Sequence, residues 1–167
     1  MKHYISALVT NRPGVLTRIS VRLSQRGFNI KSIAAGETDD VNVTRITLVV
    51  DGDETIAGQV VSQLEKLIDV RIVRLLDSDN MVQRDLVLVK VGSTSKQRGE
   101  IYDIGKIMGA EIIDVSHSTL MLAFYGNTYK VDLFVELLSK YEILEIARTG
   151  MIALEKGDGT IFSSEED

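Results

Sequence analysis

The sequence predicts an α+β fold made of two consecutive βαββαβ units. Stretches in which apolar residues alternate with polar ones predict strands, and stretches with apolar residues three and four apart predict helices. The order strand, helix, strand, strand, helix, strand occurs twice, and a polar segment at 77–80 separates the two occurrences. We therefore interpret the chain as a structural repeat.

The first unit begins almost at the amino terminus. Gly27 is expected to stop its first helix, and the turn at 38–40 joins two strands of a long hairpin. The second helix carries apolar residues at Ile56, Val60 and Leu64. The predicted elements are a strand at 4–10, a helix at about 13–26, strands at 28–37 and 42–51, a helix after 53 and a strand at 70–76.

The second unit repeats this order with a shorter hairpin. Helix-start residues at 93–97 and a stop at Gly109 bound its first helix, and Asn127 opens its second. The predicted strands are 85–91, 110–115, 119–125 and 143–154. We expect the remaining tail, 155–167, to be frayed.

Right-handed crossovers give each unit a four-stranded antiparallel sheet with both helices on one face, which is a ferredoxin-like fold. The predicted domains are 1–78 and 79–167. Val43 and Val49 would expose apolar surface on the other face of the first sheet. Packing against another such domain, in the chain or across a dimer, would cover this face, so we expect a homo-oligomer.

Composition excludes several classes of protein. A hydrophobic content of 44% supports a packed core, and the absence of cysteine removes disulfides and thiolate chemistry. The net charge of -5 argues against nucleic-acid binding, which needs a concentrated basic surface. No apolar run could span a membrane and no signal peptide is recognisable, so we expect a cytoplasmic protein.

The segment 9–16, between the first strand and the first helix, is the most informative. Pro13 suits a first helical turn, and Gly14 leaves the neighbouring backbone N–H groups uncovered. These donors and the positive end of the helix dipole could hold a carboxylate, while Asn11 offers an amide to a free amino acid. Asn, Pro and Gly are also common in loops of purely structural character, so this pattern alone leaves both interpretations open.

A second asparagine follows at the start of the next strand. Asn29 could meet Asn11 across a pair of domains, with Val15, Leu16 and Ile30 lining an aliphatic pocket.

The segments 11–16 and 26–30 resemble the ACT domain, a small-molecule sensor of amino-acid metabolism. The wider chain is similar to the small regulatory subunits of acetolactate synthase, and this resemblance covers essentially its whole length. It rests on 4–9, 27–33, 45–50 and 84–86.

The resemblance implies a regulatory chain without an active site of its own. Such a chain activates a thiamine-diphosphate-dependent catalytic large subunit in branched-chain amino acid biosynthesis, forms a homodimer through its ACT domains, and confers feedback inhibition by valine. Thiamine diphosphate, a divalent metal and FAD would belong to the catalytic partner, with none on this chain. The implied effector contacts are Asn11, Gly14, Val15, Leu16, Asn29 and Ile30.

Other functions find less support in the residues. An RNA-binding domain would need aromatic residues on a basic sheet, and a phosphohydrolase would need a fuller glycine loop with a catalytic polar set. His3 and His117 have no neighbours at metal-ligand spacing. The main alternative is a free-standing ACT-domain sensor of another pathway, because fold and pocket do not identify the partner.

Overall fold

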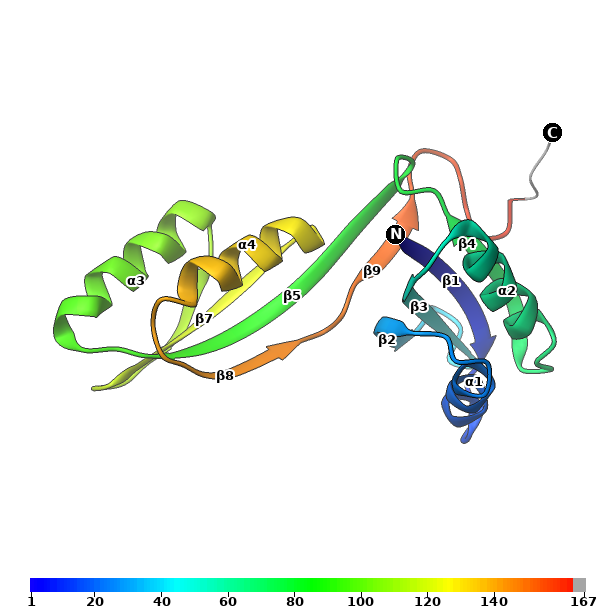
Figure 1. Cartoon of the computed structure of the whole chain (residues 1–167), viewed down its shortest axis with the longest axis horizontal. Coiled ribbons are helices and arrows are strands. Elements are labelled where there is room, and N and C mark those ends of the chain that lie inside the picture. Colours follow the sequence, from blue (N-terminus) through cyan, green and yellow to red (C-terminus); the bar gives the residue numbers. More distant parts are fainter. Residues whose placement is uncertain (164–167) are drawn as a thin grey trace. The chain divides into compact units, whose positions relative to one another are not determined.

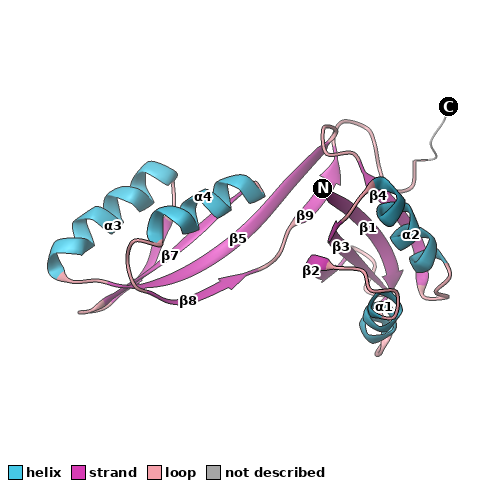
Figure 2. Ribbon diagram, in the orientation of Figure 1, coloured by secondary structure: helices cyan, strands magenta, loops and turns pink. Residues whose placement is uncertain are grey.

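The computed structural model describes residues 1–163 and divides the chain into two compact units. The first contains residues 1–82 together with the segment from Met151 onward, and the second contains residues 83–150. Figure 1 follows the chain through both units, and Figure 2 shows that each combines helices with an antiparallel sheet.

The first unit has the predicted βαββαβ order. Its sheet has the strand order β2-β3-β1-β4, with β2 and β4 at the edges. The apolar side chains of α1 and α2 pack on one face of the sheet, where Ile5, Ile19 and Leu64 are fully buried. The elements are β1 (Lys2–Thr10), α1 (Val15–Ser24), β2 (Ile30–Glu37), β3 (Val43–Asp51), α2 (Glu54–Glu65) and β4 (Val70–Leu76).

The second unit repeats the plan, as predicted. Its strands are ordered β6-β7-β5-β8, and Phe134 and Leu122 lie in the core between this sheet and its helices. Its elements are β5 (Met81–Gly92), which begins in the first unit, α3 (Ser95–Met108), β6 (Glu111–Val115), β7 (Thr119–Gly126), α4 (Thr128–Leu138) and β8 (Ile143–Arg148).

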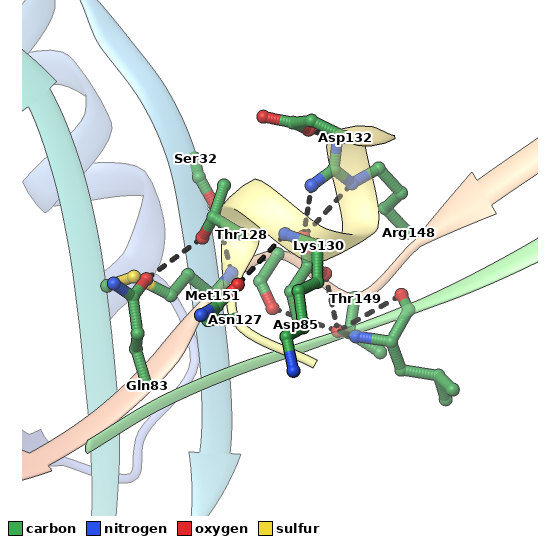
Figure 3. Close-up of polar contacts among 12 residues, drawn as sticks. Ser32, Gln83, Asp85, Asn127, Thr128, Lys130, Asp132, Arg148, Thr149 and Met151 are labelled. Atoms are coloured by element: carbon green, nitrogen blue, oxygen red, sulfur yellow. Dashed lines mark hydrogen bonds and ion pairs between the residues drawn. The ribbon is translucent and has the colours of Figure 1, made fainter. Parts of the chain in front are cut away.

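A partly buried ion pair between Arg148 and Asp85 connects β5 and β8 inside the second unit. The Nε atom of Arg148 donates to Asp85 Oδ2 at 3.0 Å, and its Nη1 donates to Asp132 Oδ1 at 2.8 Å (Figure 3). The Asp85 side chain is only 3% exposed. Burial alone would lower the pKa of Arg148, but hydrogen bonds to both carboxylates outweigh this effect and raise it.

The predicted last strand, 143–154, is two strands. The break falls at Gly150, whose φ of 80° lies in the left-handed region that glycine tolerates best. After it the chain forms β9 (Ile152–Glu155), which pairs with β5. Met151 and Ala153 are buried against Val49 and Leu76 of the first unit. The second domain was predicted to include residues 79–167, but the second compact unit ends at Gly150 and the chain from Met151 onward belongs to the first unit.

We call residues 151–163 the C-terminal return. The prediction that the tail from 155 is frayed is wrong for its described part, since Ile161 is 5% exposed and packs with Leu8 and Val43. Arg74 also donates to the carbonyl oxygens of Ile161, at 3.5 Å, and Ser163, at 3.3 Å. Residues 164–167 lie outside the part of the chain that the structure describes.

The return covers the sheet face that we expected another domain to cover. Val43 and Val49 are 6% and 5% exposed, and the side chains packed on them come from Ile161, Met151 and Ala153. The apolar face therefore needs no second domain, which removes this argument for a homo-oligomer. The edge strand β2 provides a different one, developed below.

Candidate functional site

The loop between β1 and α1 is anchored to the turn that joins β2 and β3. Asn11 Nδ2 donates to Glu37 Oε1 at 3.0 Å and to the carbonyl oxygen of Val41 at 2.9 Å. The Asn11 backbone N–H donates to the Asn42 carbonyl oxygen at 2.8 Å. Because both amide protons of the side chain are used, its oxygen remains for a ligand donor such as an ammonium group.

Helix α1 begins later than predicted and has no side-chain cap. Gly14 is the N-cap residue with a φ of 84°, so the helix starts at Val15 and Pro13 stands before it rather than in its first turn. Side chains of Asp53, Thr94 and Asn127 cap the other described helices. The first turn of α1 therefore keeps backbone donors that no side chain satisfies, as an anion site requires.

Arg18, one helical turn further, adds charge to this helix end. A Cβ placed on Gly14 would lie 3.1 Å from Arg18 Nη1, so the guanidinium group lies directly over the glycine. Arg18 Nε donates to Asp69 Oδ2 at 2.7 Å, and the Asp69 side chain is 6% exposed. Arg18 is not among the six effector contacts expected from the sequence, although its four-residue spacing from Gly14 places it one helical turn away.

The six expected contact residues fall into two groups at opposite ends of the sheet. Thr10, next to Asn11, pairs with Val43 at the start of β3, whereas Ile30 pairs with Val50 near the end of β3. A strand as long as β2 spans about 25 Å at roughly 3.3 Å per residue. The first unit by itself therefore does not bring Asn29 to Asn11.

The apolar members of the set differ in exposure. Val15 is buried in the core, Leu16 is 46% exposed, and Ile30 is partly buried against the core. Leu16 and Ile30 are therefore at least partly accessible, whereas Val15 is a core residue of α1.

The second unit has no equivalent of this open helix end. The Thr94 side chain accepts from Gln97 N, and the Gln97 side chain accepts from Thr94 N, which forms a complete capping box on α3. Among residues 1–163, no group of three or more His, Asp or Glu side chains is arranged to hold a metal ion, and no helix is long and apolar enough to cross a membrane.

Comparison with known proteins gives the same assignment for both units. Residues 5–72 match the model of the ACT domain of acetohydroxyacid synthase small subunits, and residues 84–157 match the model of the small subunit of acetolactate synthase. A probable acetolactate synthase small subunit of Archaeoglobus fulgidus is 40% identical over 159 residues, with 95% of this chain and 99% of that protein covered. The chain belongs to the acetolactate synthase small-subunit family.

Other members of this family support the assignment. The acetolactate synthase small subunit of Mycolicibacterium smegmatis is 37% identical over 93% of this chain and 91% of its own length. The crystal structure of the small subunit from Thermotoga maritima superimposes with a TM-score of 0.89 at 34% identity, covering 95% of this chain and 99% of that one. The matched segment 84–157 runs past the second unit into β9, so the family pattern includes the start of the C-terminal return.

Membership in the acetolactate synthase small-subunit family confirms three expectations: the regulatory character of the chain, its ACT domain and its place in branched-chain amino acid biosynthesis. It also implies a catalytic subunit as a partner. The six expected effector contacts stay a prediction.

Proposed function

We propose that this chain activates the catalytic subunit of acetolactate synthase and makes it sensitive to inhibition by valine. The observation that supports a ligand at this place is the uncapped first turn of α1, with Gly14 as its N-cap and the Arg18 guanidinium above it. Family membership supplies the partner and the pathway. Thiamine diphosphate, a divalent metal and FAD would be held by the catalytic subunit.

The complete site would form between two copies of the chain. Strand β2 is an edge strand, so its outward backbone groups can pair with another strand. Antiparallel pairing of β2 with β2 of a second copy, centred between Ile33 and Ala34, would set Ile30 of one copy opposite Glu37 of the other. Glu37 is hydrogen-bonded to Asn11, so this pairing would bring Asn29 of one copy to the Asn11 loop of its partner.

The chemistry of the completed site suits a branched-chain amino acid. The carboxylate would lie at the first turn of α1, which no side chain caps, beside the positive charge of Arg18, and the ammonium group would face the Asn11 oxygen and Glu37. Leu16, which is half exposed, and Ile30 of the second copy would enclose the aliphatic side chain. A dimer would then hold two equivalent sites.

Regulation would follow if valine bound one arrangement of the dimer better than another. A ligand with equal affinity for both arrangements changes no equilibrium. Coupling free energies of this kind are typically about 1–3 kcal/mol, which changes activity or affinity by roughly 5- to 150-fold.

The test is acetolactate production by the cognate catalytic subunit, with and without this chain, across a valine titration. We expect the chain to raise activity and to confer inhibition by valine, and Gly14→Asp to keep the activation while losing the inhibition. Gly109→Asp is the matched control, because Gly109 has a φ of 79° at the other end of a helix in the second unit. It imposes the same backbone strain without placing a carboxylate at the site.

Two results would contradict the proposal. If the chain leaves the catalytic subunit unchanged, the partner is wrong and the free-standing amino-acid sensor becomes the better reading. If Gly109→Asp abolishes valine inhibition as fully as Gly14→Asp does, the loss reflects general strain and the site is wrong.

A further inference from the structure

A cavity lies on the face of the first unit's sheet opposite α1 and α2. Its volume is about 420 Å³, which is in the range of small-molecule sites. It lies between the turn after β2 and the C-terminal return, with Leu8 and Val43 on the sheet side and Ile161 on the return side. None of the six expected effector contacts lines it.

Arg45 is a charged residue in the lining of this cavity. Its Nε atom is buried and makes no hydrogen bond to any described residue. Desolvation lowers the pKa of Arg45, and the nearby charge of Glu155 only partly offsets this effect. Because Arg45 lines the cavity, an anion there would lie beside a guanidinium group whose charge is only partly compensated, and would accept a charge-assisted hydrogen bond from it.

Two other charged groups at the cavity, Arg71 and Asp40, form an ion pair. Arg71 Nη1 lies 3.8 Å from Asp40 Oδ2, and Asp40 accepts from the Asn42 backbone N at 2.9 Å and from its Nδ2 at 3.0 Å. Asp39 also lines the cavity. These carboxylates would repel a dianion such as phosphate, so they restrict the ligand to a single negative charge.

The remaining surface is aliphatic. Leu8, Val43 and Ile161 are each 5–6% exposed and form a small apolar cluster beside Arg45. Phe162 also lines the cavity and is 68% exposed. These groups match a ligand that has one negatively charged hydrogen-bond acceptor and an aliphatic hydrocarbon part.

We propose that this cavity is a second binding site, which takes a small aliphatic monocarboxylate. Its carboxylate accepts from the Arg45 guanidinium group, and its hydrocarbon body packs on Leu8, Val43 and Ile161. Because Ile161 belongs to the C-terminal return, the bound acid also holds the return against the sheet. At ten times the dissociation constant, backbone amides of the return should exchange with solvent about tenfold more slowly.

The test uses the full chain with labelled Ile, Leu and Val methyl groups, followed by NMR. The probe is 3-methylbutanoate, and its neutral analogue 3-methylbutanamide has the same shape without the charge. We expect saturable shifts of the Ile161, Leu8 and Val43 methyl signals with the acid and none with the amide. Equal shifts with the amide, or shifts centred on Leu16 and Ile30 instead, would overturn the proposal.

Variants and a second ligand sharpen the result. Arg45→Gln should weaken binding of the acid at least tenfold, whereas Arg22→Gln on α1, which does not line the cavity, should leave it unchanged. The comparison of acid and amide needs no variant, so it decides the matter even if Arg45→Gln does not fold. A titration of the Gly14→Asp chain with valine and with 3-methylbutanoate distinguishes amino acids from free carboxylic acids as the ligand. Shifts with both compounds indicate a site for amino acids, and shifts with 3-methylbutanoate alone indicate a site for free acids. The absence of shifts with either compound refutes the site.

Discussion

Replacing Arg148 by methionine should strongly destabilise the second unit. The change keeps much of the side-chain volume but removes the donors that reach Asp85 and Asp132 (Figure 3). Asp85 is 3% exposed, and among residues 1–163 its side chain would keep only the Thr149 hydroxyl group, 3.3 Å from its Oδ1. Breaking a buried pair in this way costs about 3–5 kcal/mol, because an uncompensated charge stays buried.

The assay is equilibrium unfolding in urea, followed by circular dichroism and analysed as the difference between variant and wild type. Asp132→Asn is the matched control. It touches the same arginine, but Asp132 is 51% exposed, so the expected loss is below about 1 kcal/mol. If Arg148→Met costs no more than Asp132→Asn, the pair between β5 and β8 contributes little and this reasoning about burial is wrong.

Three further predictions concern the return, a helix cap and a turn. Met151→Ala should cost about 2–5 kcal/mol, because Met151 is 2% exposed in the cluster that covers the first sheet; a loss below 1 kcal/mol in urea unfolding would show that the return packs only loosely. Thr94→Ala should lower the free energy of unfolding by about 1 kcal/mol, because it removes the capping box that Thr94 forms with Gln97. Thermal unfolding of Thr94→Ala, Gln97→Ala and the double variant should show that the two single losses are not additive, since both residues belong to one capping box. Hydrogen bonds from the backbone and side chain of Asn42 lower the pKa of Asp40 in the folded protein. The stability from this turn is therefore fully present above the ordinary aspartate pKa of 3.8 and is lost as the pH falls through the lower pKa of the folded state. The NMR signal of the Asn42 amide should titrate with a midpoint below pH 3.8, and a midpoint above that would contradict the assignment.

Hydrophobic periodicity was sufficient to predict both βαββαβ units, because each helix and strand buries one face and the pattern records it. Periodicity did not predict the course of the chain after Gly150. The apolar pattern of 143–154 continues across Gly150, so only the positive φ of that glycine, visible in the structure, shows that the strand ends and the chain crosses to the first unit. The C-terminal return packs on residues that are far away in the sequence, such as Leu8 against Ile161. Contacts of this kind cannot be predicted from the local pattern of apolar residues.

One feature of the candidate site, the open start of α1, was also predictable from the sequence. Asn11 and Gly14 stand out in the sequence because a strand-to-helix loop with these residues leaves backbone donors open, and the structure agrees that α1 has no side-chain cap. The bond from Asn11 to Glu37 and the pairing of Arg18 with Asp69 depend on strand register and helix docking, so the sequence did not reveal them.

The measurement that tests the central claim most directly is calorimetric titration of valine into mixed dimers of Asn11→Ala and Asn29→Ala. If each site takes Asn11 from one copy and Asn29 from the other, either variant alone should bind no valine. A mixed dimer contains one intact site, so an equal mixture that exchanges subunits freely should recover about a quarter of the wild-type capacity. Valine binding by either variant alone at wild-type affinity, or no recovery on mixing, would contradict a valine site shared between two copies of this chain.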